Sequence, residues 1–257
     1  MRYVFFSFLL IWGVSSKLMG QTPITTKNQA IWAAVVNKIY FSDKFYLSNE
    51  FHLRRANWGL SAEQIIERPA LNYDFAKFIT GSIGYSFVLN DPYGTIPAPL
   101  PTLEHNIWEQ IVLKHKLEKL SFKHRYRIEH RFVQRIGQDA NQSYYIDGFQ
   151  FRQRFRYRFT LNYTLKSFKD QQAKLFIQAF DELFLNINSP QTTAPIFNQN
   201  WIYIGLGYAF NPHGNIQLGY MNQSFQRNAS WFENNHNIVL SFSYNIHLKK
   251  PLKKPTN

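Results

Sequence analysis

Arginine recurs at every second position in one stretch of the chain. This spacing could place several positive charges side by side, where they would bind anionic groups. Between residues 149 and 165 the even positions include Arg152, Arg154, Arg156 and Arg158, and the odd positions are mostly Phe, Tyr and Leu. Guanidinium groups bind carboxylates and other oxyanions through paired hydrogen bonds. A helix, at about 100° per residue, would scatter these arginines over opposite faces, whereas a strand keeps them together. The stretch therefore predicts a strand with one cationic and one apolar face.

A second stretch, residues 120–132, has the same design, with apolar residues alternating with Lys and Arg. Carboxylates lie within it and on other segments that could neighbour it. Cross-strand pairs of opposite charge stabilise a sheet. We therefore expect a charge network made of Arg125, Arg127, Glu129, Arg131, Arg152, Arg154, Arg156, Arg158, Glu182, Glu104 and Glu50.

The elements that must position these charges are also strands. Weaker alternation recurs over residues 45–53, 79–89, 175–185, 202–210, 216–220 and 237–248. About eleven segments are strand-like in all, whereas bacterial single-chain barrels have an even number. We expect twelve strands, with ten as the alternative. Either a short strand precedes residues 32–40, or residues 64–73, which contain Pro69, do not form a full span.

Short and long connections alternate along the chain, as they do in outer-membrane barrels. Short breaks are predicted near residues 42–43, 74–77, 118–119, 169–170 and 211–214. Longer polar or Pro-rich connections are predicted at residues 91–102, 137–143, 189–195 and 227–235. The pattern favours an up-and-down order of strands.

The first twenty residues have a basic start, an apolar run of about twelve residues and small residues near their end, as secretion signals do. Cleavage is expected after Gly20, or after Ser16. No later run reaches the about 18 apolar residues of a membrane-spanning helix, so insertion would use strands. The chain has no Cys, which excludes disulfides and thiolate metal sites. We divide it into a signal peptide (1–20), a barrel (21–248) and a basic tail (249–257).

These observations predict an all-β, antiparallel, up-and-down transmembrane β-barrel in a bacterial outer membrane, with a soluble β-protein as the competing fold. Arg facing lipid near the midplane would cost about 2–4 kcal/mol, so the Arg-rich faces should line the lumen. Trp201, Tyr208, Tyr163 and Tyr220 are expected in the aromatic girdles at the membrane surfaces. The expected partners are membrane lipids and the barrel-assembly machinery. Nucleic acid is not expected, because the Arg and aromatic residues fall on opposite faces and form no common stacking surface.

Several functions fit such a barrel. The charges could form a structural network that fills the lumen, or a porin-like pore that selects or binds a small anionic solute. A lipid-active enzyme, an acyl hydrolase or transferase, is the alternative class. Only Ser241 and Ser243 near His247 would suit it, and the chain has no GxSxG, HExxH or glycine-rich phosphate loop. We expect no cofactor and no metal, and the balance leans away from an enzyme.

A set of motifs spread over the chain carries a resemblance to a known family. The motifs are Glu104-His105, Trp108, Gln110, residues 124–132, residues 154–158, Glu182 with Asn186, and residues 198–200. Together they resemble the domain-of-unknown-function 2490 family, outer-membrane barrels of Bacteroidetes-type bacteria. Asn106 stands where the family pattern leads one to expect Arg. The resemblance implies the fold and the location, because the activity of the family is uncharacterised.

Overall fold

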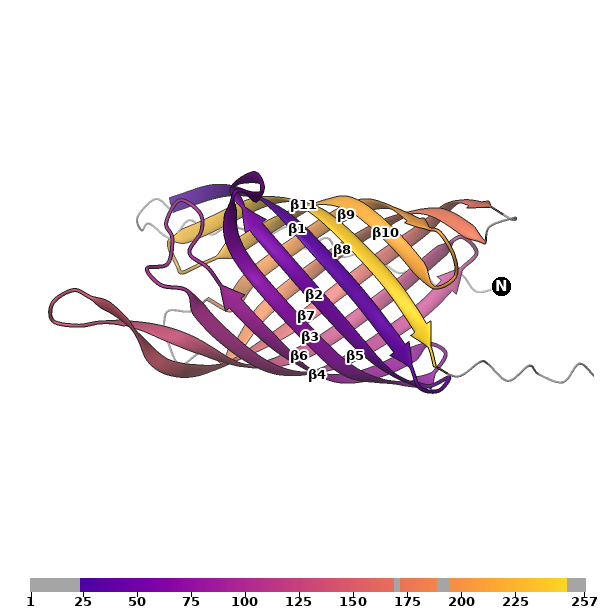
Figure 1. The fold of residues 1–257 in the computed structure, drawn as a ribbon, viewed down its shortest axis with the longest axis horizontal. Coiled ribbons are helices and arrows are strands. Elements are labelled where there is room, and N and C mark those ends of the chain that lie inside the picture. The colour runs from indigo at the N-terminus through magenta and orange to yellow at the C-terminus, as the bar shows by residue number, and fades with distance from the viewer. Residues whose placement is uncertain (1–23, 169–171, 189–194, 249–257) are drawn as a thin grey trace, which may run out of the picture.

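The computed structural model describes residues 24–168, 172–188 and 195–248, and these form a closed barrel of eleven strands (Figure 1). The predicted signal peptide, its two cleavage sites and the basic tail lie outside the described residues. The strands are β1 (Ile24–Tyr40), β2 (Phe45–Ala56), β3 (Ser61–Ala76), β4 (Ile79–Asn90), β5 (Thr102–Leu117), β6 (Leu120–Gln138), β7 (Tyr144–Phe168), β8 (Ala173–Asn188), β9 (Phe197–Ala209), β10 (Gly214–Gln226) and β11 (Trp231–His247). A single 3-10 turn, Asn57–Gly59, lies in the β2–β3 connection.

The barrel closes through a parallel pair, and this explains its odd number of strands. Consecutive strands pair in an antiparallel manner, but β1 and β11 run in the same direction, from Ile24 beside Trp231 to Tyr40 beside His247. The all-β barrel is confirmed, whereas the preference for twelve strands, and the alternative of ten, is wrong. Because the count is odd, the described chain begins at one rim and ends at the other.

The segment that contains Pro69 forms a full strand. The suggestion that residues 64–73 are not a full span, which would have given an even number of strands, is therefore wrong. Pro69 pairs with Asn49 of β2, but the β3–β4 ladder is interrupted at Arg68 and Pro69. Proline has no N–H to donate to a ladder, and the interruption removes the need for one. The strand therefore continues to Ala76 without a break.

The two rims differ in their connections. At the rim that we call the turn end, strands are joined by short turns such as those after Tyr40, Ala76 and Leu117. At the other rim, the loop end, the β4–β5 connection is long and the β6–β7 hairpin projects furthest from the barrel (Figure 1). The prediction of a long connection over residues 227–235 is wrong, since β11 already begins at Trp231. The predicted breaks at 169–170 and 189–195 fall mostly outside the described residues.

The barrel is apolar outside and polar inside, as the alternation predicts. On β11, Leu240 faces outward with 44% of its surface exposed, while Asn237 faces inward and is fully buried. The outward residues of β6 and β7 include Tyr126, Ile128, Phe132 and Phe151, all exposed. No helix among the described residues is long and apolar enough to cross a membrane.

Large lumen side chains are accommodated by glycines on neighbouring strands. The ring of Trp108 on β5 covers Gly84 of β4, where an added Cβ would lie 2.2 Å from its Cζ2 atom. Tyr203 of β9 covers Gly219 of β10 in the same way. Tyr203 also belongs to a small apolar cluster with Ala30, Trp32 and Met221. One wall of the lumen is thus aromatic, and the wall formed by β5–β8 carries most of the charge.

Candidate functional site

Two buried glutamates organise the charges in the middle of the barrel. Glu129 on β6 has no exposed surface, and it accepts hydrogen bonds from Arg154 Nε (2.7 Å) and Arg156 Nη1 (2.6 Å). Arg127 lies further away, with its Nη1 atom 3.9 Å from Glu129 Oε1. One carboxylate therefore faces three guanidinium groups inside the lumen.

Glu182 on β8 binds a second set of arginines. It is also fully buried, and its Oε1 atom accepts a hydrogen bond from Arg156 Nε at 2.8 Å and lies 2.8 Å from Arg156 Nη2. Arg158 Nε donates to its other oxygen at 2.7 Å, and Arg125 pairs with it from β6. Arg156 bridges the two glutamates, so β6, β7 and β8 share one continuous network.

The remaining predicted residues lie in the lumen but not in this centre. Glu104 accepts two bonds from Arg131, at 2.7 and 2.6 Å, nearer the loop end. Glu50 binds a residue that the sequence reasoning missed, Arg68 of β3, at 2.9 Å. Arg152 donates only to the amide oxygen of Gln150 and pairs with no carboxylate among the described residues.

Aromatic rings complete the centre, and the sequence reasoning missed most of them. The guanidinium of Arg127 lies 3.8 Å from the ring centre of Trp108, and that of Arg54 lies 3.6 Å from Trp32. Trp201 of β9 contacts Trp32 edge-on at 5.5 Å. Its expected place in a membrane-surface girdle is wrong, because its position on β9 turns its side chain into the lumen with Tyr203. The signal that the sequence reasoning missed is the alternation along β9. Its odd-numbered positions, which include Gln199, Trp201 and Tyr203, face the lumen.

These residues form a belt across the lumen that we call the waist: Trp32, Arg54, Trp108, Arg127, Glu129, Arg156, Glu182, Phe184 and Trp201. Two separate cavities flank it, one of about 580 Å³ at the turn end and one of about 530 Å³ at the loop end. Only Arg54, Arg68, Arg156 and Trp201 line both cavities. The buried side chains of the waist thus lie between the two cavities and narrow the lumen there.

The turn-end chamber is strongly basic. Eight Lys and Arg side chains line it, and Glu50 is its one lining carboxylate. Lys38 and Lys123 make no ion pair with any described residue. Lys38 is within electrostatic reach of two other cations, Lys114 and Lys123, and of two carboxylates, Asp74 and Glu50. Among the described residues, the lining of the chamber therefore holds more cationic than anionic side chains.

The loop-end chamber is covered by the β4–β5 loop, whose residues 96–100 line it. Tyr93 fixes this loop to the far strands, since its hydroxyl donates to Glu233 Oε1 (2.9 Å) and accepts from Arg227 Nη2 (2.8 Å). Burial raises the pKa of Tyr93 above its ordinary value, so the hydroxyl keeps its proton. Arg227 also pairs with Glu233 at 2.7 Å, and the three side chains form a latch.

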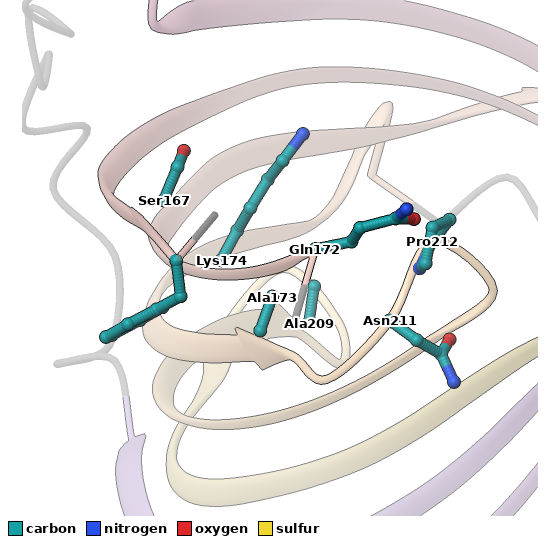
Figure 2. Close-up of a pocket in the computed structure, with 8 residues that line it drawn as sticks. Ser167, Gln172, Ala173, Lys174, Ala209, Asn211 and Pro212 are labelled. Atoms are coloured by element: carbon teal, nitrogen blue, oxygen red, sulfur yellow. The ribbon is translucent and has the colours of Figure 1, made fainter. Parts of the chain in front are cut away.

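A third hollow, of about 450 Å³, lies on the turn-end rim between the β7–β8 and β9–β10 connections (Figure 2). Of the described residues that line it, only Lys174 is charged. Figure 2 shows mostly small or amide side chains around it, such as Ser167, Gln172 and Asn211. This composition is typical of a rim between turns and offers no reacting groups.

Groups for catalysis or metal binding are not assembled in the part of the chain that the structure describes. No cluster of three or more His, Asp or Glu residues with metal-binding geometry occurs there. Ser241 and Ser243 do line the turn-end chamber, but neither hydroxyl forms a hydrogen bond with a described histidine. His124 instead bonds Tyr157 on the outer face, at 2.9 Å.

Comparison with known proteins identifies the family. The family model described as "Protein of unknown function (DUF2490)" matches residues 29–234, well over half of the chain. The chain belongs to the DUF2490 family. The resemblance carried by residues 104–132 and the downstream motifs is thereby confirmed, and the family name assigns no activity. No curated protein matches this chain.

One similar solved structure is the crystal structure of the β domain of the Bordetella autotransporter BrkA. It shares 9% sequence identity, with a TM-score of 0.42, over 79% of this chain and 83% of that chain. At this level of likeness no function is transferred.

Proposed function

We propose that this DUF2490 protein is an integral outer-membrane barrel with a structural role, whose lumen is closed by the waist and does not conduct solutes freely. The observation that carries the proposal is the belt of buried Arg, Glu and Trp side chains that lies across the lumen between the two cavities. The exposed apolar residues of the outer face supply the contact with lipid, because acyl chains solvate aliphatic and aromatic groups.

Membrane insertion is tested with two neighbouring substitutions on β11. Leu240→Arg places a charge on the outer face near the middle of the strand, whereas Ser241→Arg places it in the turn-end chamber. The first should destabilise the inserted barrel by about 2–4 kcal/mol and the second should cost much less. Heat-dependent migration on gels and extraction from membranes measure this. Release of the wild type by high salt without detergent would overturn the proposal.

Closure of the lumen is tested in planar bilayers. The wild type should show no conductance steps, while a double variant, Arg54→Ala with Trp201→Ala, should open the waist and conduct. Conductance of the variant would also show that the barrel inserts into the bilayer. The absence of conductance in the wild type would then indicate a closed lumen. Steady conductance of the wild type comparable with that of the variant would contradict a closed waist.

A second candidate function, binding of a small anionic solute, is supported by the turn-end chamber. The strands alone line this chamber, and Lys38 and Lys123 are without carboxylate partners among the described residues. Clustered cations in a recess concentrate field lines and attract anions. The chamber would therefore bind a compact, multiply charged oxyanion from the turn-end side.

Titration calorimetry with inorganic pyrophosphate tests this binding. Lys38→Ala and Lys123→Ala should each weaken it by about tenfold, which corresponds to 1.4 kcal/mol. Lys119→Ala is the matched control, because Lys119 lies in the β5–β6 turn and does not line the chamber. Raised salt should weaken binding by screening. Equal binding by all three variants, or no binding by the wild type, would remove this candidate.

A further inference from the structure

The outer face of the barrel carries a carboxylate in the middle of an apolar surface. Glu109 points outward from β5, between Ile107 and Ile111, and 54% of its side chain is exposed. It lies seven residues from the first residue of β5 and eight from the last. Glu109 therefore lies near the middle of the strand.

Glu109 is the end of a chain of hydrogen bonds across three strands. Gln153 Nε2 donates to His130 Nδ1 (3.1 Å), and His130 Nε2 lies 3.2 Å from Glu109 Oε2. Because an amide nitrogen can only donate, Nδ1 must accept, and the imidazole proton sits on Nε2, directed at the carboxylate.

A second polar group lies on the same side. Asp181 points outward from β8, close to the middle of that strand, and accepts a bond from Asn200 Nδ2 of β9 at 2.6 Å. Between the two carboxylates, Tyr157 and His124 bond each other at 2.9 Å. The outer face of β5–β9 is thus interrupted by acids and by the groups that bind them.

The rest of the outer face is different. Across β10, β11 and β1 the exposed residues near mid-strand are aliphatic, such as Leu218 and Leu240, or aromatic, such as Tyr220, and none of those described is a carboxylate. One other outward carboxylate, Glu67 on β3, is only partly exposed and accepts a bond from Asn49 at 2.5 Å. The exposed carboxylates at mid-depth are therefore gathered on one side of the described barrel.

Acyl chains offer no hydrogen-bond donors, so an acid exposed to them loses its hydration without compensation. Covering by protein removes this cost. The face carries both carboxylates and histidine, tyrosine and amide donors, and is therefore complementary to itself, which is the requirement of a two-fold interface.

We propose that the outer face of β5–β9 is the interface between two copies of this chain in the membrane, with Glu109 and Asp181 covered by the partner copy. The inference rests on the proposed insertion of the barrel into a bilayer.

The test counts subunits in lipid bilayers by single-molecule photobleaching of the labelled full chain. The wild type should bleach mainly in two steps. Glu109→Leu with Asp181→Leu should raise the dissociation constant by at least about tenfold. His236→Leu is the matched control, since it removes a hydrogen bond to Tyr220 (2.6 Å) from the outer face of β10–β11 and should leave the dimer intact.

Cross-linking gives a second readout, because the chain contains no Cys. Ile128→Cys, beside Glu109 on β6, should yield a dimer with a short thiol-reactive linker, and Leu240→Cys should not. A wild type that stays inserted but bleaches in one step would overturn the interface alone, whereas salt-extractable protein would overturn the membrane proposal. A dimer that persists in the double variant, or that forms only through Leu240→Cys, would also overturn the interface.

Discussion

The waist and the turn-end chamber are built from the same kinds of residue on many of the same strands, yet their charges are paired differently. In the waist, Glu129 and Glu182 have no exposed surface and each faces several arginines. In the chamber, Lys38 and Lys123 form no ion pair with a described carboxylate, although Asp74 and Glu50 lie within electrostatic reach of Lys38. The difference shows that the position of a few acids along the barrel axis decides where the lumen is filled and where it stays open to a ligand.

The difference between the waist and the chamber is tested with the largest expected effect by removing a buried glutamate of the waist. Glu182→Ala leaves three guanidinium groups without their shared carboxylate, and breaking a buried ion pair in this way costs about 3–5 kcal/mol. The unfolding midpoint in urea, followed by gel migration, should fall accordingly. Glu182→Gln keeps the shape and should cost less than the alanine variant. An unchanged midpoint for Glu182→Ala would show that the waist does not depend on its charges.

Packing of the waist is tested at Gly84. Gly84→Val would drive its side chain into Trp108, whose ring covers Arg127, and overpacking of this kind costs about 1–3 kcal/mol. Tryptophan fluorescence during unfolding reports the change. Gly81→Val on the outer face of the same strand is the control, because the exposed ring of Phe75 can move away. Equal losses in both variants would argue against a tightly packed waist.

The latch at the loop end should have a smaller effect. Tyr93→Phe removes the hydroxyl that joins Arg227 to Glu233, and a single hydrogen bond of this type contributes about 1 kcal/mol. Hydrogen exchange of residues 91–101 should become faster while the strands remain protected. If the loop exchanges at the wild-type rate, Tyr93 does not hold it.

The chamber should give the smallest effect on stability. Lys123→Ala removes a cation that meets only other cations, so the free energy of unfolding should change by no more than about 0.5 kcal/mol. The urea midpoint measures this, with Lys119→Ala as the reference. A loss similar to that of Glu182→Ala would remove the distinction between the two regions.

The alternation of Arg and aromatic residues predicted the strands and their faces, because a period of two leaves a strand no other way to sort its side chains. In the structure, Glu129, Arg127, Arg154 and Arg156, which it singled out, are buried. It could not find Arg68 or Trp32, since their strands show weaker alternation. The role of Trp201 was misjudged because an isolated Trp fits a girdle and a lumen equally well.

By itself, the amino-acid sequence determined that this chain forms a barrel with an apolar outside and a cationic inside, because periodicity acts within each strand. Only the tertiary structure decided the number of strands, since closure depends on whether β1 and β11 can pair, in parallel, across the whole length of the chain. It also decided the division of the lumen. The level at which Glu182 meets Arg125, Arg156 and Arg158 is set by the registers of β6, β7 and β8, which no single strand encodes.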